Sequence, residues 1–463
     1  MAAVTVRRWD VVVVGAGPVG SLLAGALAGH GASVLVLERD REIPDQTRAS
    51  TLNSRAMEIL SALGVPGLED HPRSMFGHYG GVPVDLEHLD SPWAGLWTIP
   101  QPRLVRMLRD WATGNGAVID SGVAVVGARI APPSVLTDTA DGVTHESRIL
   151  VGADGRESTV RAALDFGVTT TRASRHMVRC DVTGIEVARR RFERHGDAVA
   201  AAGAISPRTT RLMLHCPHYD ASAAPSFAEV AGDWLAATGE RVDGGECVWL
   251  DTFSNACATV RDWQVGSAFL AGDAAHDQPP VGGSSLNTGI QDVYNLAWKL
   301  AAVLGGAPAE VVETYGPERA EATARMQEEV RDQEAVIFGP DRSRAEVLRE
   351  RLAGSASFRE DIARSIAGLD TRYPSSTGVG PRISPAALSR ELGRPLAPDE
   401  ESALGRRTIL VTDPGTRNLR LTIRPDGHAV QGPGGSSTVP GEALPRRSAH
   451  PTDPVVLKAG SHA

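Results

Sequence analysis

The sequence contains few cysteines and no excess of positive charge. Its four cysteines, Cys180, Cys216, Cys247 and Cys257, form neither a CxxC pair nor a metal-ligand spacing. We therefore expect reduced thiols, with no disulfide framework and no metal site, which is typical of a cytoplasmic protein. The net charge of -9 leaves no basic patch for nucleic acid and no polybasic anchor for a membrane.

The chain also lacks a long hydrophobic run. No apolar stretch reaches the roughly 20 residues that a membrane-spanning helix needs. An apolar segment does follow Arg7 and Arg8, as in a signal peptide, but glycines and a proline interrupt it and no cleavage site precedes Glu38. With 463 residues, of which 42% are hydrophobic and 22% charged, the chain is typical of a soluble protein. Its length predicts about two or three domains.

The first informative segment is glycine-rich and lies near the N-terminus. Val11–Val14 is a continuous apolar run, as expected of a parallel strand covered on both faces, and Gly15-x-Gly17-x-x-Gly20 follows it directly. The glycines allow a tight turn, and the start of the next helix offers free N–H groups to a pyrophosphate. Glu38, at the end of a second apolar run, is placed to accept hydrogen bonds from ribose hydroxyls. Because an acid disfavours a 2′-phosphate, the segment predicts an FAD or NAD site rather than a primary NADP site.

A second glycine-rich segment, Phe269–Gly283, decides between these cofactors. Asp273 follows a short apolar strand and can reach the ribityl chain of a flavin. Gly282 and Gly283 leave room for a ring, beside the N-terminus of the following helix. Donors at that helix end would stabilise negative charge on the pyrimidine side of a reduced flavin. The two segments together predict FAD held at both ends, and Asp273 would have no role in a plain nicotinamide dehydrogenase.

Three motifs taken together resemble those of the single-component, FAD-dependent aromatic hydroxylases. This family includes para-hydroxybenzoate hydroxylase, phenol hydroxylase and the hydroxylases that tailor aromatic polyketides. The motifs are Gly15–Gly20, Gly152–Arg156 and Gly272–Gly283, and the helix around Asn287 continues the pattern. The resemblance covers residues 9–330.

The resemblance implies which residues contact the cofactors. Arg48 and Gln101 would contact FAD, and Asp273 would hold its ribityl chain. Asp154 and Gly155 would serve both FAD and the nicotinamide donor. The complete set of implied cofactor-binding residues is Gly15, Gly17, Gly20, Glu38, Arg39, Arg48, Gln101, Asp154, Gly155, Asp273, Pro280, Gly283, Ser285, Leu286 and Asn287. Pro280, Gly282 and Gly283 would surround the flavin ring, and no residue is assigned as a catalytic base.

The implied fold is α/β, with a Rossmann-type FAD-binding domain and an inserted β-rich substrate domain. A shortened C-terminal domain resembles part of a thioredoxin-like fold, but without CxxC we expect no thiol redox chemistry there. We expect residues 1–168 to form the first part of the FAD-binding domain, and 169–263 the substrate domain. Residues 264–340 complete the FAD-binding domain and include a charged helix expected on the surface. Residues 341–463 form the C-terminal region, with a flexible tail from Gln431.

The resemblance implies a monooxygenase that acts on an aromatic or polyketide-like intermediate, as in antibiotic biosynthesis. NADPH or NADH would reduce FAD, the reduced flavin would react with O2 to give a C4a-hydroperoxide, and its distal oxygen would pass to the substrate. Baeyer–Villiger oxygenation or epoxidation by the same family stays open, as does a non-catalytic protein that binds FAD and a ligand. The substrate's identity and the formation of a homodimer also stay open.

One residue departs from the family pattern. Ser285 stands where relatives have a glycine close to the flavin, and a serine is strained there if the position requires positive φ. We expect His215, His218 and Tyr219, in the substrate domain, to be structural rather than catalytic. We expect His276 to be a packing and hydrogen-bonding residue beside Asp273.

Overall fold

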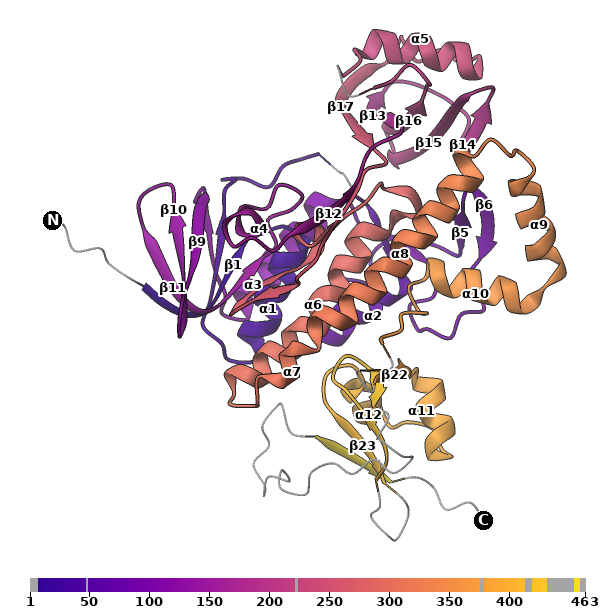
Figure 1. Cartoon of the computed structure of the whole chain (residues 1–463). Coiled ribbons are helices and arrows are strands. Elements are labelled where there is room, and N and C mark those ends of the chain that lie inside the picture. Colours follow the sequence, from indigo (N-terminus) through magenta and orange to yellow (C-terminus); the bar gives the residue numbers. More distant parts are fainter. Residues whose placement is uncertain are drawn as a thin grey trace.

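The computed structural model describes residues 7–46, 49–220, 224–374, 376, 379–412, 419–430 and 454–458. A mixed α/β body lies in the middle of Figure 1, a β-sheet with helix α5 at one end and a small sheet near the C-terminus at the other. The α/β class expected from the sequence is confirmed. Over the described ranges, none of the helices combines the length and the apolar character needed to cross a bilayer.

A mainly parallel sheet forms the centre of the body. Its path runs β19-β20-β11-β1-β2-β8, and β10 and β9 extend it from β11. Val11–Val14 is buried because β11 and β2 flank it and helices cover both faces. The strands are β1 (Arg7–Val14), β2 (Val34–Glu38), β8 (Val118–Ser121), β9 (Val125–Ala131), β10 (Ser134–Thr139), β11 (Thr144–Gly152), β19 (Gln264–Val265) and β20 (Ala268–Leu270).

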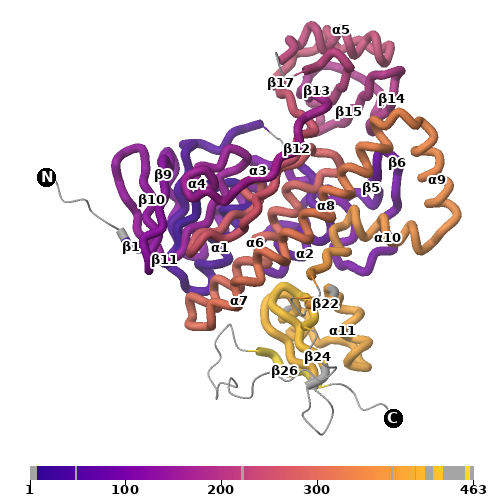
Figure 2. Tube along the Cα trace, in the orientation of Figure 1, coloured from indigo at the N-terminus to yellow at the C-terminus, as the bar shows by residue number. Residues whose placement is uncertain are grey.

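The helices on this sheet pack closely because α1 is rich in small residues. A Cβ added to Gly25 of α1 would lie 2.2 Å from the ring of Trp111 on α3, so glycine allows the two helices to approach. Figure 2 shows the indigo helix α1 and the orange helix α6 in the same body, although more than 250 residues separate them. The helices are α1 (Pro18–Gly29), α2 (Ser54–Leu63), α3 (Gln101–Gly114), α4 (Thr159–Ala163), α6 (Ser284–Leu304) and α7 (Glu310–Glu313).

A separate antiparallel sheet carries a helix on one face and turns the other towards the body. Val178, Cys180 and Val182 of β13 pack with Trp234 of α5. On the opposite face, Val199 of β15 packs with Val281, which belongs to the second glycine-rich segment just before α6. The elements, in sheet order, are β14 (Arg190–His195), β15 (Ala198–Ser206), β16 (Thr209–His215), β13 (His176–Thr183) and β17 (Glu246–Ser254), with α5 (Phe227–Thr238).

The charged helix α8 (Tyr315–Phe338) is not a surface helix, which corrects the expectation from its composition. Tyr315, Glu318, Arg319 and Thr323 are all buried in its first half. It is followed by α9 (Arg344–Gly354) and α10 (Ala356–Ile366). The remaining short strands of the body are β3 (Thr51–Asn53), β4 (Arg73–Ser74), β5 (Phe76–Tyr79), β6 (Val82–Asp85), β7 (Leu96–Thr98), β12 (Val168–Thr171), β18 (Cys257–Val260) and β21 (His276–Asp277).

The C-terminal region forms a third sheet, in the order β22-β25-β24-β23-β26. Its elements are β22 (Val379–Arg382), α11 (Pro385–Leu392), α12 (Pro398–Ala403), β23 (Ile409–Thr412), β24 (Leu419–Ile423), β25 (His428–Val430) and β26 (Val455–Lys458). Because β26 pairs in parallel with β23, that part of the expected flexible tail is wrong. The rest of the tail, residues 431–453 and 459–463, lies outside the described residues. The likeness to part of a thioredoxin-like fold stays a prediction.

Candidate cofactor site

The first glycine motif begins where β1 ends, at the carboxyl edge of the sheet. Gly15 has φ +97°, and a Cβ on it would lie 2.5 Å from the carbonyl oxygen of Ala153. A Cβ on Gly20 would lie 1.9 Å from the carbonyl oxygen of Gly15. A Cβ on Gly17, by contrast, would meet no atom within 4 Å. Two of the glycines are therefore needed by the fold itself, and the third borders open space.

This open space faces the start of α1. Gly17 is the N-cap of that helix and makes no side-chain capping bond, so the first N–H groups of α1 are available to an anion. Buried Glu38, at the end of β2, accepts a 2.7 Å hydrogen bond from the N–H of Ala16 and pairs with Arg109 at 3.5 Å. Arg39 follows it and is exposed. The Glu38 carboxylate thus also braces the turn, a role that the sequence did not indicate.

The second motif lies at the end of the neighbouring strand β11. Oδ2 of Asp154 accepts bonds from the N–H groups of Thr159 and Val160, at 2.7 and 3.3 Å, and so caps α4. Its Oδ1 is buried and has no hydrogen-bond partner among the described residues. Burial raises the pKa of Asp154. Gly155 follows with φ +80°. One oxygen of Asp154 therefore holds the fold, and the other is buried without a hydrogen-bond partner among the described residues.

The third motif follows β20 and places Asp273 in a short 3-10 helix, η1 (Gly272–Ala274). The Asp273 side chain is exposed, yet enough protein surrounds it that loss of hydration raises its pKa. That combination is typical of a carboxyl group in the wall of a cleft. Arg156, from the second motif, pairs with Asp277 at 2.8 Å, so the second and third motifs are joined.

The buried carboxylate of Asp292 supports the Gly272 turn. Asp292 on α6 accepts bonds from the N–H of Gly272 at 2.9 Å, from Nε2 of His276 at 2.7 Å and from Nε of Arg319 at 2.7 Å. Burial alone would raise the pKa of Asp292, but the charges of His276 and Arg319 lower it to about 2. The same carboxylate overcomes burial and raises the pKa of His276. His276 is thus a hydrogen-bonding residue, and its hydrogen-bond partner is Asp292.

The turn before α6 contains two consecutive glycines with positive φ. They are Gly282 at +73° and Gly283 at +67°, in a 3-10 helix, η2 (Val281–Gly283), that begins after Pro280. Ser285 lies in the first turn of α6 and has no positive φ, so the strain considered for it is absent. The serine is therefore compatible with the local backbone.

Asn287 connects α6 to β3. Its Oδ1 accepts a 2.9 Å bond from the N–H of Asn53, and its Nδ2 donates to the carbonyl oxygens of Thr51 and Gly283 at 3.2 and 2.8 Å. Leu286 beside it is half-buried. The structure therefore uses Asn287 to hold the glycine turn against β3.

Gln101 is a further predicted cofactor-binding residue. Gln101, the first residue of α3, accepts a 3.1 Å bond from the N–H of Ala49 through its Oε1. The chain thus brings Gln101 to the segment next to Arg48, but Arg48 itself lies outside the described residues.

A cavity of about 100 Å³ adjoins the glycine turn. Gly282, Gly283 and Asn287 form one wall, and Glu329 and Asp370 line it as well. A larger cavity of about 570 Å³ lies at the other end of α6, lined by Arg148, Trp298 and Arg406 among others. The smaller cavity is the more relevant one, because it touches the motif and the larger one does not.

The sequence did not indicate two arginines on the face of the β14-β15-β16-β13-β17 sheet that is turned away from α5. Arg179 on β13 pairs with Asp251 at 2.8 Å and lies 5.1 Å from the Trp249 ring centre. Arg211 on β16 pairs with Asp181 at 2.7 Å and lies 5.2 Å from the same ring. Since side chains alternate along a strand and Cys180 faces α5, this arginine–tryptophan layer is turned towards the body.

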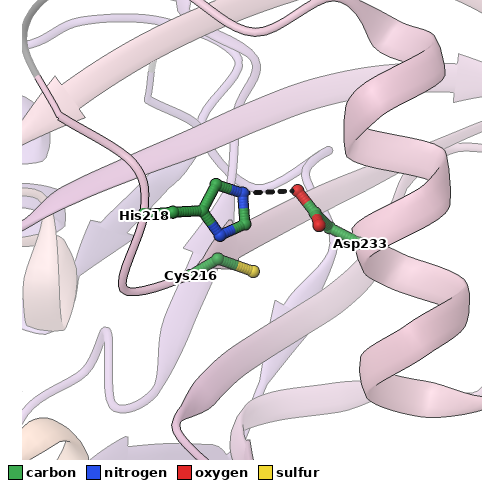
Figure 3. A group of neighbouring side chains, drawn as sticks. All are labelled: Cys216, His218 and Asp233. Atoms are coloured by element: carbon green, nitrogen blue, oxygen red, sulfur yellow. Dashed lines mark hydrogen bonds and ion pairs between the residues drawn. The ribbon is translucent and has the colours of Figure 1, made fainter.

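Figure 3 shows a further group of polar side chains, on the α5 side of this sheet. Asp233 of α5 accepts bonds from Nε2 of His218 at 3.1 Å and from the hydroxyl of Tyr219 at 2.8 Å. Cys216 lies near them, with the three ligand atoms within 4.8 Å of one another. Burial raises the pKa of the Cys216 thiol to about 11, which favours a neutral thiol. His215, nearby, bonds the carbonyl oxygen of His176 at 2.8 Å. These bonds give His215, His218 and Tyr219 structural roles.

The arrangement at the sheet edge fits FAD. An uncapped helix N-terminus with open space beyond Gly17 suits a pyrophosphate, and Asp154, with its unpartnered oxygen, follows the neighbouring strand β11. Asp273 and the Gly282–Gly283 turn stand further along it. These residues come from β1, β11 and β20, three adjacent strands that end side by side.

Comparison with known proteins agrees with this arrangement. The sequence model of a family described as "FAD binding domain" matches residues 8–330. The chain is 32% identical to rifampicin monooxygenase of Rhodococcus hoagii, over 91% of this chain and 94% of that protein. It is 30% identical to dialkyldecalin synthase of Streptomyces rugosporus, over 79% and 81%. The crystal structure of CabE, an aromatic hydroxylase from angucycline biosynthesis, superposes with a TM-score of 0.80 at 28% identity, over 94% of this chain and 98% of that one.

Proposed function

The chain belongs to the family described as FAD binding domain and is an FAD-dependent monooxygenase, and we propose that it uses NADPH or NADH to insert one atom of O2 into an aromatic or polyketide-like molecule. The meeting of three motifs at one sheet edge, beside a cavity, carries this proposal. When bound, FAD supplies hydride acceptance from a nicotinamide and the activation of O2.

The protein's first task is to hold the two ends of the cofactor. The start of α1, with Gly17, would bind the pyrophosphate, and Glu38 would bind the ribose next to it. Asp273 would hold the ribityl chain from the cleft wall. The Asp292 carboxylate fixes the Gly272 turn through a 2.9 Å bond, so Asp273 stands on a rigid support.

The second task is to position the ring and exclude water. The N-terminus of α6 would face the pyrimidine side of the ring, where its dipole favours negative charge. Val281 packs with Val199, Val330 and Ile337, which closes this side of the turn to solvent. With water excluded by these residues, the oxygen chemistry that bound FAD supplies would be directed to the substrate rather than lost to solvent.

The arginine–tryptophan layer of the β14-β15-β16-β13-β17 sheet supports a flat aromatic substrate. Its side chains face the body, on the sheet whose Val199 touches the second glycine-rich segment. Arginines paired with Asp181 and Asp251 can stack on an aromatic ring or bond a phenolic or quinone oxygen. We therefore place the substrate between this layer and the Gly282–Gly283 turn.

The test is substrate-dependent consumption of NADPH and O2 by the purified, FAD-loaded protein. Rifampicin, simple phenols and polycyclic quinones form the first set of candidates, and the rate without substrate is the control. We expect one of them to accelerate NADPH oxidation and to yield a product heavier by one oxygen atom. A ring-opened or epoxide product would identify Baeyer–Villiger oxygenation or epoxidation instead. Protein that stays colourless in the presence of FAD would contradict the proposal.

One relative favours a second candidate, a flavoprotein that acts on its ligand without inserting oxygen. That relative is named a synthase rather than a monooxygenase. This alternative predicts a yellow protein that binds or converts a polycyclic ligand while NADPH oxidation stays at the rate without substrate. The same assay therefore separates the two candidates.

A further inference from the structure

Two acidic side chains share the wall of the cavity beside the Gly282–Gly283 turn. Glu329 comes from α8 and Asp370 from the turn after α10, and both are half-buried. Acids are seldom drawn together in this way unless a cation or a proton separates them. Neither residue belongs to a motif, and the oxygen-insertion proposal gives neither of them a role.

The surroundings favour the charge of Asp370 more than that of Glu329, because Arg325, Arg364 and Arg372 act on Asp370 whereas Arg325 alone acts on Glu329. The charged and titratable groups around the pair are Arg325 and Asp332 on α8, Arg319 on the same helix, Arg364 on α10, Arg372 beyond it, and His78 and Tyr79 on β5. Arg319 is committed to Asp292. Burial lowers the pKa of His78 to about 4, so His78 is neutral near pH 7. Arg325 is the cation that acts on both acids, and Asp332 opposes it at Glu329.

The consequence is a carboxyl group that changes charge near neutrality. Burial and the charge of Asp370 raise the pKa of Glu329 to about 7, although Ser365 donates a 2.7 Å hydrogen bond to its Oε2. Burial also raises the pKa of Asp370. A base tuned to the working pH accepts a proton from a phenol far more readily than an ordinary carboxylate does.

We propose that Glu329, with Asp370 as its partner, is the proton acceptor for a phenolic or enolic hydroxyl bound in this cavity. The hydroxyl O–H bond breaks, a new O–H bond forms on a Glu329 carboxylate oxygen, and the electron pair stays on the substrate oxygen. The negative charge makes the ring more electron-rich, which favours attack on an electrophilic oxygen. Glu329 would be the catalytic residue and Asp370 a positioning residue that controls its charge. The inference rests on the proposed oxygen-insertion reaction.

The first test needs neither substrate nor turnover. Infrared spectra of the FAD-loaded protein at different pH values report a protonated carboxyl group through its C=O band. We expect a carboxyl band that disappears near pH 7, that is absent in Glu329→Gln, and that moves down by about one pH unit in Asp370→Asn because the repelling charge is gone. Glu328→Gln, at the exposed neighbour on α8, is the matched control and should leave the band unchanged. A Glu329 carboxyl that ionises in its ordinary acidic range would overturn the proposal.

The second test uses 4-nitrophenol, whose phenol and phenolate forms differ in visible absorption. We expect the wild type and Glu328→Gln to bind it as phenolate at a pH where the free compound is largely neutral, and Glu329→Gln to bind it as neutral phenol. Failure to bind, or phenolate binding that persists in Glu329→Gln, would overturn the proposal. With a turned-over substrate, Glu329→Gln should lose about 100-fold in kcat/KM. If no substrate is turned over, the oxygen-insertion proposal fails on its own, because neither spectroscopic test depends on it.

Discussion

Two glycines of the first motif, Gly15 and Gly17, differ in what surrounds them, and this separates folding from cofactor binding. Gly15→Ala places a methyl group 2.5 Å from the Ala153 carbonyl oxygen at φ +97°. We expect it to lose about 1–3 kcal/mol of folding free energy from backbone strain alone, with or without FAD. Thermal unfolding of the apoprotein measures this loss.

Gly17→Ala is the matched variant, because its methyl group meets no protein atom within 4 Å and its φ of -68° suits alanine. We expect the free energy of unfolding of the Gly17→Ala apoprotein to lie within about 0.5 kcal/mol of the wild-type value. FAD should bind at least about tenfold more weakly, because the methyl group occupies the space assigned to the pyrophosphate. Equal FAD affinity of Gly17→Ala and wild type would place the pyrophosphate elsewhere.

Glu329 also makes stability depend on pH in a direction opposite to most acids. Its folded-state pKa of about 7 lies above the unfolded value, so the folded protein holds this proton more tightly. The group therefore favours folding at low pH, and its contribution is lost as the pH rises through about 7. Glu329→Gln removes the ionisation, so we expect its melting temperature, relative to the wild type, to rise between about pH 5 and about pH 8.

The matched control for this comparison is Glu328→Gln, at an exposed position. Its melting temperature should differ from that of the wild type by the same amount at every pH. A constant difference for Glu329→Gln as well would show that Glu329 ionises at an ordinary pH. The same result would remove the basis for its role as a proton acceptor.

The single residues that the sequence predicted are those whose role is local. A glycine with positive φ, such as Gly15, and an acid at the end of a strand, such as Glu38, follow from the residues beside them. Glu329 and Asp370 could not be predicted, because 40 intervening residues and the packing of α8 decide that they meet. Ser285 was considered for strain because a family pattern, rather than the local backbone, suggested positive φ.

At the scale of elements, the charged contact between α6 and α8 holds the cofactor turn in place. Asp292 of α6 bonds both His276 and Arg319 at 2.7 Å, and all three side chains are buried. Asp292→Asn would leave the Arg319 guanidinium buried without its counter-charge. We expect a loss of about 3–5 kcal/mol in the free energy of unfolding, measured by denaturant titration.

Glu313→Gln, an exposed acid on α7, serves as the control and should change stability by less than about 0.5 kcal/mol. If Asp292→Asn behaved like this control, the three buried groups would not act as one unit. The sequence predicted α6 from its apolar face but not this contact, because Arg319 is 27 residues away and its helix looked like a surface helix.

At the scale of the whole molecule, a turn of the C-terminal sheet enters the body. Arg424 donates bonds of 2.7 and 2.9 Å to the two carboxylate oxygens of Glu318 on α8, and it also pairs with Asp426. Lys299 of α6 shares Glu318 at 2.8 Å. Burial lowers the pKa of Lys299 to about 8, and only the acids keep it from falling further. The C-terminal region thus completes a buried ion network of the cofactor-binding body, although it carries no recognised motif.

Arg424→Met tests whether the C-terminal region stabilises the body through this network. The methionine fills similar space, but Glu318 and Asp426 then share one amine, Lys299, in a buried setting. We expect the free energy of unfolding to fall by about 3–5 kcal/mol. FAD should also bind more weakly, because α6 and α8 both support the Gly272 turn. Arg394→Met, which breaks the half-exposed pair with Glu400 inside the C-terminal region, should cost only about 1 kcal/mol.

A double variant decides whether the Arg424 effect is electrostatic. Arg424→Met takes away the arginine partner of Glu318, and adding Glu318→Gln then removes the charge of that acid. The double variant should therefore lose less free energy of unfolding than the two single variants lose in sum. Additive losses would mean that Arg424 acts by filling space, and the C-terminal region would then be attached by packing alone. Less-than-additive losses would show that the charged groups of α6, α8 and a turn more than 100 residues further on stabilise one another as one buried network.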